Sequence, residues 1–485
     1  MQSKRERRQD ELFIASSLSA LIPDDHILKR VDRILDLSWI HDAVRGCYCQ
    51  NNGRPSIDPE AALRLMLAGF FYRITGDREL MREAQVNIAI RWFMGYRLDE
   101  PLPDRSSLTT IRQRWGDSLY RDVFERTVKQ CMAAGLVNAQ TVHIDATLIR
   151  ADVSWDSIVT HHVEQTIEEN KDDDNSDAPL PPRRGRHRSS PPQQKKYSPT
   201  DPDASMATSS HRYHLEPSYK QHTAVEDSNG VIVNVEVTTG EVNEGHRLIG
   251  QIERIESLTG TPIETVTADR GYAHPTNYAL LEAKGIDAII PPQAVAVRKN
   301  TVQRLPLRRF KYDAHKHRVT CPAGKHLHRA GRNTTDKAYW YRARSRDCAA
   351  CPLRERCISS SSSSRHVLIV DGYAALIRAR RRKEKGWDDA TRENYTRHRW
   401  RVEGVHGRAK QQHGLRRAAR RGLSEVRIQS YLTATAMNLK KLTTVTGRAL
   451  LRVIFALWRK PTLWNQNQPP TLYIHPMTTV WALSF

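Results

Sequence analysis

The chain has 485 residues, of which 76 are Lys or Arg and 54 are Asp or Glu, so its formal net charge is +22. It has no apolar run of about 18 residues, which excludes an ordinary membrane-spanning helix. Its ten Trp and sixteen Tyr argue against a chain that is disordered throughout. The length predicts roughly two to four domains. The excess of positive charge favours a polyanionic partner, above all nucleic acid, although a merely soluble basic protein stays open.

The cysteines and the N-terminus bear on the cellular compartment. Seven Cys in 485 residues are too few for a disulfide scaffold, which favours a reducing compartment. A basic start and an apolar stretch at 12–22 loosely resemble a signal peptide, but Asp10 and Glu11 interrupt them. We therefore expect an amphipathic N-terminal helix and a cytoplasmic protein.

Residues 1–135 are expected to form a helical DNA-binding domain, although a plain helical bundle would give the same pattern. Asp58 and Pro59 predict a helix start, and the helix has one apolar face. A single helix is expected over Leu80–Ile90. Ser106 or Ser107 is expected to be the N-cap of the last helix.

Residues 136–294 are expected to form the first part of an α/β core, a mixed sheet flanked by helices. The pattern predicts strands at 141–149, 219–227, 231–237, 262–268 and 288–290, with helices at 245–258 and 277–284. Asn229-Gly230 predicts a hairpin. The low-complexity stretch within this part, residues 167–212, is expected to be a disordered linker or loop.

Residues 295–385 are rich in Cys, His and Arg and are expected to be an insertion with too few large apolar residues for a core of its own. Residues 386–442 are expected to return to the core as helices. The tail at 443–485 has no predicted role.

Three acidic residues stand out as candidates for catalysis. Asp145 lies inside an apolar strand, where a carboxylate needs a partner. Asp269 follows another strand, at an edge where α/β sheets bind ligands. Glu403 lies in a helix among many basic residues. Taken one by one, a structural aspartate, a helix N-cap and a surface glutamate explain them equally well, and spacing alone does not join them.

The surrounding residues resemble the DDE transposases of bacterial insertion sequences, in the IS4/IS5-like group and most closely the IS1182 family. His143-Ile144-Asp145-Ala146-Thr147 is similar to their first catalytic strand, and Ala268-Asp269-Arg270-Gly271-Tyr272 to the second. Arg399, Glu403 and Lys410 match their Tyr-Arg-Glu-Lys signature and share one helix face. Tyr395 departs from it by one position. The N-terminal segments that resemble the helical domain of these transposases are 53–59, 76–80, 87–93 and 103–107.

The resemblance implies an RNase H-like fold and an enzyme. Asp145, Asp269 and Glu403 would bind two Mg²⁺ or Mn²⁺ ions, which suit hard oxygen ligands. The enzyme would cleave phosphodiester bonds at the ends of its element and join the 3′-OH to target DNA. Arg399, Lys410 and Arg270 would contact DNA. The partners would be double-stranded DNA, as terminal inverted repeats and as target, with no membrane, and the protein would act as a homodimer on DNA.

The cysteines of the insertion suggest a second metal. Cys348 and Cys351 have the Cys-x-x-Cys spacing that lets two sulfurs bind one tetrahedral ion, and Cys321 and Cys357 could complete a structural Zn²⁺ site. The alternative is a set of reduced, partly buried thiols. Insertions with cysteines also occur in IS1182-type transposases.

Two other functions stay open on the sequence alone. One is a non-catalytic or inactivated DNA-binding relative. The other is a stand-alone metal-dependent nuclease, which would share the carboxylates but would not join DNA strands.

Overall fold

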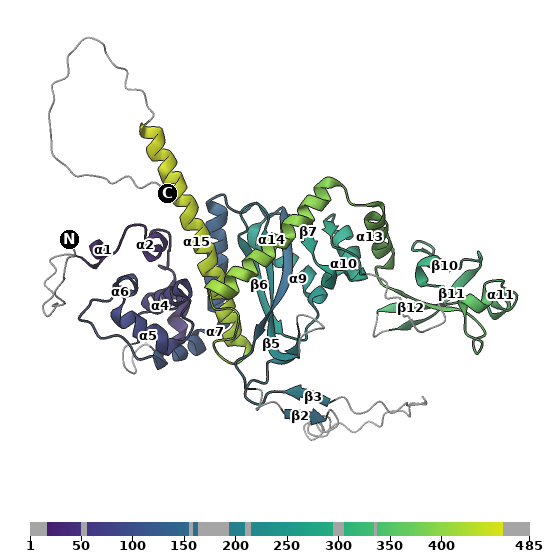
Figure 1. Cartoon of the computed structure of the whole chain (residues 1–485), viewed down its shortest axis with the longest axis horizontal. Coiled ribbons are helices and arrows are strands. Elements are labelled where there is room, and N and C mark those ends of the chain that lie inside the picture. Colours follow the sequence, from purple (N-terminus) through teal and green to yellow (C-terminus); the bar gives the residue numbers. More distant parts are fainter. Residues whose placement is uncertain are drawn as a thin grey trace, which may run out of the picture. The chain divides into compact units, whose positions relative to one another are not determined.

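The computed structural model describes residues 17–49, 56–154, 159–162, 194–208, 215–293, 305–333 and 337–458 (Figure 1). In the part of the chain that it describes, no helix is both long enough and apolar enough to cross a membrane.

The N-terminal part is helical, as the sequence predicts. The Asp58 carboxylate accepts the N–H of Ala61 at 2.9 Å, and Pro59 occupies the first turn, so the predicted start of the fourth helix is confirmed. Its predicted apolar face is buried in the core. The elements are α1 (Leu18–Leu21), α2 (Ile27–Asp32), α3 (Ile40–Val44), η1 (Arg45–Cys47), α4 (Pro59–Tyr72), α5 (Asp77–Val86), α6 (Ile88–Met94) and α7 (Ser106–Ala133).

Two local expectations in this part are wrong. The expected single helix over Leu80–Ile90 is divided into α5 and α6, because the Asn87 side chain accepts the N–H groups of Ala89 and Ile90 and starts a new helix. At α7, Ser106 is already helical. The Asp104 carboxylate accepts the N–H of Ser106 at 2.8 Å, so the side chain that caps the start of α7 is an aspartate and not a serine.

Strands from the middle of the sequence form a mixed sheet (Figure 1). β1 pairs antiparallel with β5 and parallel with β7, β5 pairs antiparallel with β6, and β7 pairs parallel with β8. The main order is therefore β6-β5-β1-β7-β8, with β4 added along β5. The bounds are β1 (Thr141–Arg150), β4 (Ser205–Ala207), β5 (Glu216–Glu226), β6 (Ile232–Thr239), β7 (Thr265–Ala268) and β8 (Asp287–Ile289).

The sequence predicts these five main strands because each is an apolar run bounded by turn residues. Val142, Ile144 and Ile149 on β1 are fully buried. The β5–β6 hairpin is also confirmed, and Gly230 in its turn has φ +65°, a left-handed conformation that favours glycine.

Helices flank this sheet. α14 packs against β1, β5 and β7, while α7 and α9 contact β6. The remaining elements of the core are η3 (Glu244–Arg247), α9 (Leu248–Thr259), η4 (Arg270–Tyr272), α10 (Pro275–Ala283), α13 (Tyr373–Lys385), α14 (Asp389–Gln412) and α15 (Leu423–Trp458). The last helix therefore runs beyond the predicted boundary at 442, and the rest of the tail, 459–485, lies outside the described residues.

The expected linker at 167–212 is described only at 194–208. There the chain forms β3 (Gln194–Tyr197), which pairs with β2 (Val159–His162), and then β4. Asp201 is buried and accepts both the Tyr219 hydroxyl and the N–H of Gly422. For 194–208 the expectation of a disordered linker is therefore wrong, because backbone pairing and a buried carboxylate hold this low-complexity stretch in place.

The insertion forms a sheet of its own, in the order β13-β12-β11-β10-β9 (Figure 1). Its interior includes Val319, Leu327 and Tyr341, all nearly inaccessible, so the expected lack of a core is wrong. The elements are η5 (Leu307–Arg309), β9 (Lys311–Asp313), β10 (Arg318–Thr320), β11 (His326–Asn333), β12 (Ala338–Arg342), α11 (Ser345–Ala349), α12 (Arg354–Cys357) and β13 (His366–Val370).

The helix α13 was expected within the insertion but is tied to the core. Arg378 donates from Nε to Glu282 on α10 at 3.1 Å, and Arg382 forms an ion pair with Asp287 on β8. The insertion therefore ends before α13.

Candidate active site

Asp145 and Asp269 lie side by side at the centre of the sheet. In the parallel pairing of β1 with β7, Ile144 is the partner of Ala268, so the next residue on each strand is an aspartate. Asp145 continues along β1, while β7 ends and Asp269 begins the turn that follows. Two residues 124 positions apart in sequence are thus brought together by strand register alone.

The surroundings of Asp145 disfavour its charge. Its side chain is only 21% exposed. Burial, together with the negative charges of Asp269, Glu244 and Glu403, raises the pKa of Asp145 to about 7, while a backbone hydrogen bond from Ala146 acts in the opposite direction. The charges of both other members of the expected triad therefore act on Asp145, and so does the charge of Glu244, which the sequence did not single out.

Asp269 is held by the turn that it starts. Its Oδ1 accepts the N–H of Gly271 at 2.8 Å, so it caps the short helix η4. Burial raises the pKa of Asp269, while the N–H groups of Gly271 and Tyr272 and the cation of Lys220 oppose the shift. The capping role and a role in a site are compatible, because the second carboxylate oxygen is not needed for the cap.

Glu403 lies on α14 and is more exposed to solvent than Asp145. Its side chain is 63% exposed, and Oε1 lies 3.5 Å from Nε of Arg399 one turn earlier. Its neighbours Val402 and Val405 are buried against the sheet. Glu403 is near enough for its charge to act on Asp145 but is paired with a surface arginine.

A buried chain of hydrogen bonds fixes α14 against the two strands. Thr267 on β7 bonds through Oγ1 to His143 Nδ1 at 2.6 Å and to His398 Nδ1 at 3.0 Å. The other ring nitrogen of His143 bonds to Asp227 at 2.8 Å, and Arg397 pairs with the same carboxylate at 3.0 Å. These contacts set the position of the helix that carries Glu403.

His406 is a residue of the site that the sequence reasoning missed. Its Nδ1 lies 3.7 Å from Oδ2 of Asp145, and its Nε2 is buried without a hydrogen-bond partner. Burial, with Lys410 and His398 nearby, lowers the pKa of His406 to about 3, so the ring is neutral at pH 7. The signal was available, since His406 lies one helical turn after Val402 on the buried face of α14.

The three predicted DNA-binding residues differ in how exposed they are to solvent. Arg399 is 80% exposed, and Arg270 is exposed at the start of η4. Lys410 is half-buried, and burial lowers its pKa while Asp145 acts in the opposite direction. Arg399 and Arg270 are thus open to a large ligand, whereas Lys410 is partly enclosed and lies within electrostatic reach of Asp145.

Within the described ranges, no group of three or more His, Cys, Asp or Glu side chains is arranged closely enough to hold a metal ion. The structure thus brings Asp145 and Asp269 together and leaves Glu403 apart.

The four cysteines of the insertion gather at one cavity. Cys321, Cys348, Cys351 and Cys357 line it together. The Cys321 sulfur accepts the N–H of Lys325 at 3.3 Å. Burial raises the pKa of Cys357, and the three other thiols raise it further. The predicted residues are therefore brought together, although not at the spacing of a closed metal site.

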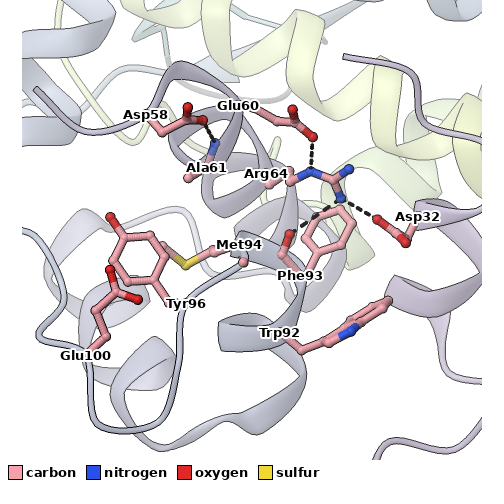
Figure 2. Close-up of a pocket in the computed structure, with 11 residues that line it drawn as sticks. Asp32, Asp58, Glu60, Ala61, Arg64, Trp92, Phe93, Met94, Tyr96 and Glu100 are labelled. Atoms are coloured by element: carbon pink, nitrogen blue, oxygen red, sulfur yellow. Dashed lines mark hydrogen bonds and ion pairs between the residues drawn. The ribbon is translucent and has the colours of Figure 1, made fainter. Parts of the chain in front are cut away.

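A separate cavity of about 540 Å³ lies in the helical domain (Figure 2). Arg64 crosses it and bonds to Asp32 at 2.6 Å and to Glu60 at 2.8 Å. Asp58 and Glu100 add further negative charge to the lining. An acidic cavity whose arginine is already paired does not suit DNA phosphates, so DNA binding by this domain needs another face.

Two stretches of the chain match transposase families. Residues 16–114 match a transposase domain (DUF772), and residues 320–443 match a transposase DDE domain. The second stretch contains Glu403 and the four cysteines, whereas Asp145 and Asp269 lie between the two matches. Together the matches support a DDE transposase of an insertion sequence. No curated protein matches the chain.

Among solved structures, the chain is similar to a piggyBac transposase synaptic complex with hairpin DNA, at 8% identity and a TM-score of 0.32, covering 90% of this chain and 82% of that one. It is also similar to a Mos1 transposase paired-end complex with the left transposon end, at 11% identity and a TM-score of 0.16, covering 50% and 61%. Overlaps this weak carry no structural argument.

Proposed function

We propose that this chain, which carries two stretches matching transposase domains, cleaves phosphodiester bonds at the ends of an insertion sequence and joins the 3′-OH to target DNA. Asp145, Asp269 and Glu403 are its catalytic carboxylates. The observation that carries the proposal is the register of β1 and β7, which puts Asp145 beside Asp269, with the helix of Glu403 packed on both strands.

The topology supports an RNase H-like core. Numbered in chain order, the five main strands are arranged 3-2-1-4-5, with the first three antiparallel and the last two parallel to the first. A mixed sheet of this kind, flanked by helices, agrees with the RNase H-like fold that the resemblance implies. The further assignment to the IS1182 family rests on the sequence motifs quoted above.

The chemistry of these residues, although not their spacing in the structure, fits a divalent cation. A buried aspartate with a raised pKa, next to a second carboxylate and within reach of a third, is a site where a cation would relieve both burial and repulsion. Oxygen ligands of this kind select Mg²⁺ or Mn²⁺. Two such ions would lower the pKa of the attacking water or hydroxyl and stabilise the leaving oxygen.

The basic residues near the site would hold the DNA. Arg399 and Arg270, both exposed, would bind phosphates on either side of the scissile bond. Lys410, half-buried, would face the phosphate nearest Asp145. The net charge of +22 would supply the remaining attraction. Pairing of two element ends would require at least two copies of the chain, which we propose act as a homodimer.

We also propose a structural Zn²⁺ in the insertion, bound by Cys321, Cys348, Cys351 and Cys357. Its support is the shared cavity and the backbone N–H aimed at the Cys321 sulfur. Thiolate sulfurs bound to zinc often accept such bonds, which orient the ligand.

A labelled terminal inverted repeat, incubated with the protein and Mg²⁺, tests the function. The expected result is end cleavage and strand joining, both abolished by Asp145→Asn, Asp269→Asn and Glu403→Gln with DNA binding retained. Asp389→Asn, a fully exposed position at the start of the same helix, is the matched control and should leave activity unchanged.

The alternatives give different results in the same assay. Full activity in the three variants would reject the triad. DNA binding without cleavage by the unmodified protein would favour a non-catalytic relative. Cleavage without joining would favour a stand-alone nuclease.

A further inference from the structure

Glu244 lies against Asp269, although the two residues come from different loops. A methyl group placed on Gly271 would meet Glu244 Oε2 at 2.7 Å and Asp269 Oδ1 at 3.0 Å. Both carboxylates therefore face the same small volume beside the α-carbon of Gly271. Any side chain at that position would push them apart.

The two loops are locked together, so this approach is built into the fold. The amide of Asn277 donates to the carbonyl of Gly245 at 2.8 Å and to that of Tyr272 at 3.0 Å, and it is buried. His274 Nε2 bonds to Asn243 Oδ1 at 3.0 Å. These bonds join η3, which carries Glu244, to η4, whose N-cap is Asp269.

Lys220 is the cation next to this pair. Its Nζ lies 3.2 Å from Oε1 of Glu244 and donates to the carbonyl of Val242 at 2.8 Å. Burial and Asp269 raise the pKa of Glu244, and Lys220 counteracts that shift. Lys220 therefore partly neutralises the two carboxylates.

A second and independent sign of a ligand is the hydroxyl of Tyr272. The side chain is fully buried, and its hydroxyl has no hydrogen-bond partner. Burial raises the pKa of Tyr272, and the charges of Asp145, Glu244 and Asp269 also raise it, so the phenol lies within electrostatic reach of all three acids. A buried polar group without a partner is costly unless something at the site bonds to it.

We propose that Glu244 is a fourth carboxylate of the divalent-cation site and binds the ion next to Asp269. In the protein without the metal ion, the ammonium of Lys220 neutralises the Glu244 carboxylate. This inference rests on the proposed function, since it extends the same site. It assigns the unpaired Tyr272 hydroxyl to a water or phosphate oxygen held there.

Binding of Mn²⁺ to the full-length protein without DNA, followed by electron paramagnetic resonance, tests this independently of activity. Glu244→Gln should weaken Mn²⁺ binding by about 10–100-fold, the range known for removing a supporting group at a metal site. Glu253→Gln, on the exposed side of the next helix, should bind as the unmodified protein does. Lys220→Gln should bind Mn²⁺ at least as tightly, because a competing cation is gone.

The possible results separate the two proposals. If Asp269→Asn loses Mn²⁺ and Glu244→Gln does not, the role of Glu244 is refuted and the proposed active site stands. If neither Asp145→Asn nor Asp269→Asn changes Mn²⁺ binding, the active site itself is refuted. Circular dichroism would check folding. Should Glu244→Gln fail to fold, Glu244→Ala takes its place, and unchanged Mn²⁺ affinity in that variant would equally refute the proposal.

Discussion

Nδ1 of His406 lies 3.7 Å from Oδ2 of Asp145, so a buried neutral imidazole on α14 contacts the first of the proposed catalytic aspartates. The imidazole touches the strand that carries Asp145 and belongs to the helix that carries Glu403. It therefore links the two parts of the site directly.

His406→Phe keeps the ring volume and removes the nitrogen that contacts Asp145. We expect the rate of end cleavage at saturating DNA to fall by about 10–100-fold, as for other groups that orient a metal ligand. DNA affinity should be unchanged, because His406 is buried away from DNA. His406→Gln, which restores a polar atom, should recover part of the rate. Equal rates in the Phe variant and the unmodified protein would exclude a positioning role.

Asp145→Asn should make the metal-free protein more stable. A carboxyl whose folded pKa is raised contributes stability only at low pH, and that stability is lost as the pH rises towards about 7. Removing the charge should raise the free energy of unfolding at pH 8 by about 1–3 kcal/mol, which urea denaturation would measure. Near pH 4 the difference should vanish. A variant that is less stable at pH 8 would contradict the picture of an uncompensated buried charge.

Thr267→Val removes the hydroxyl that bridges the rings of His143 and His398. Two buried ring nitrogens then lose a partner, and we expect a loss of about 2 kcal/mol in the free energy of unfolding. Thr265→Val, two residues earlier on β7, is the matched control and should change stability by less than about 0.5 kcal/mol. Similar losses in both variants would mean that any Thr→Val change in this strand lowers the free energy of unfolding, and that the hydrogen bonds of Thr267 are not the reason.

His413 makes folding sensitive to acid. Its Nδ1 donates to the carbonyl of Phe70 at 2.9 Å, and Lys440 donates to its Nε2 at 3.4 Å. Burial and Lys440 lower its pKa to about 4 from an ordinary 6.5. Because the folded pKa is lower, stability is complete above about pH 6.5 and is lost as the pH falls towards 4, by up to about 3 kcal/mol.

Urea denaturation at pH 7.5 and pH 5, with His413→Gln beside the unmodified protein, measures this effect. Gln can still donate to Phe70 but does not titrate, so the difference in stability between the two pH values should shrink. A difference of the same size in both proteins would assign the acid sensitivity to other groups, such as the buried His222 or His398.

The zinc proposal predicts about one zinc ion per chain in protein purified without chelators, measured by elemental analysis. Cys348→Ser should lose it, since three thiolates bind zinc much more weakly than four. Cys49→Ser, which changes an exposed cysteine outside the insertion, should retain the zinc ion. Protein without zinc but with a folded insertion would identify the four cysteines as simple thiols.

Local signals in the sequence predict the main strands and hairpin, and they point to the three candidate acids. Apolar runs identify β1 and β7, an Asn-Gly pair identifies the β5–β6 hairpin, and helical spacing puts Glu403 and Lys410 on one face, because each of these signals acts over a few residues. Motif resemblance joined Asp145 to Asp269, and strand register gives that pairing its physical basis.

The side chains that lie near these acids are known only from the folded chain. His406, Glu244 and Lys220 come from a helix, a loop and a strand whose contacts depend on packing and register across long separations, which no periodicity encodes. For the same reason two predictions from the sequence are wrong, namely disorder at 194–208 and the lack of a core in the insertion. Pairing with a distant strand orders a low-complexity stretch, and a small sheet can build a core from a few apolar residues once its register brings them to one side.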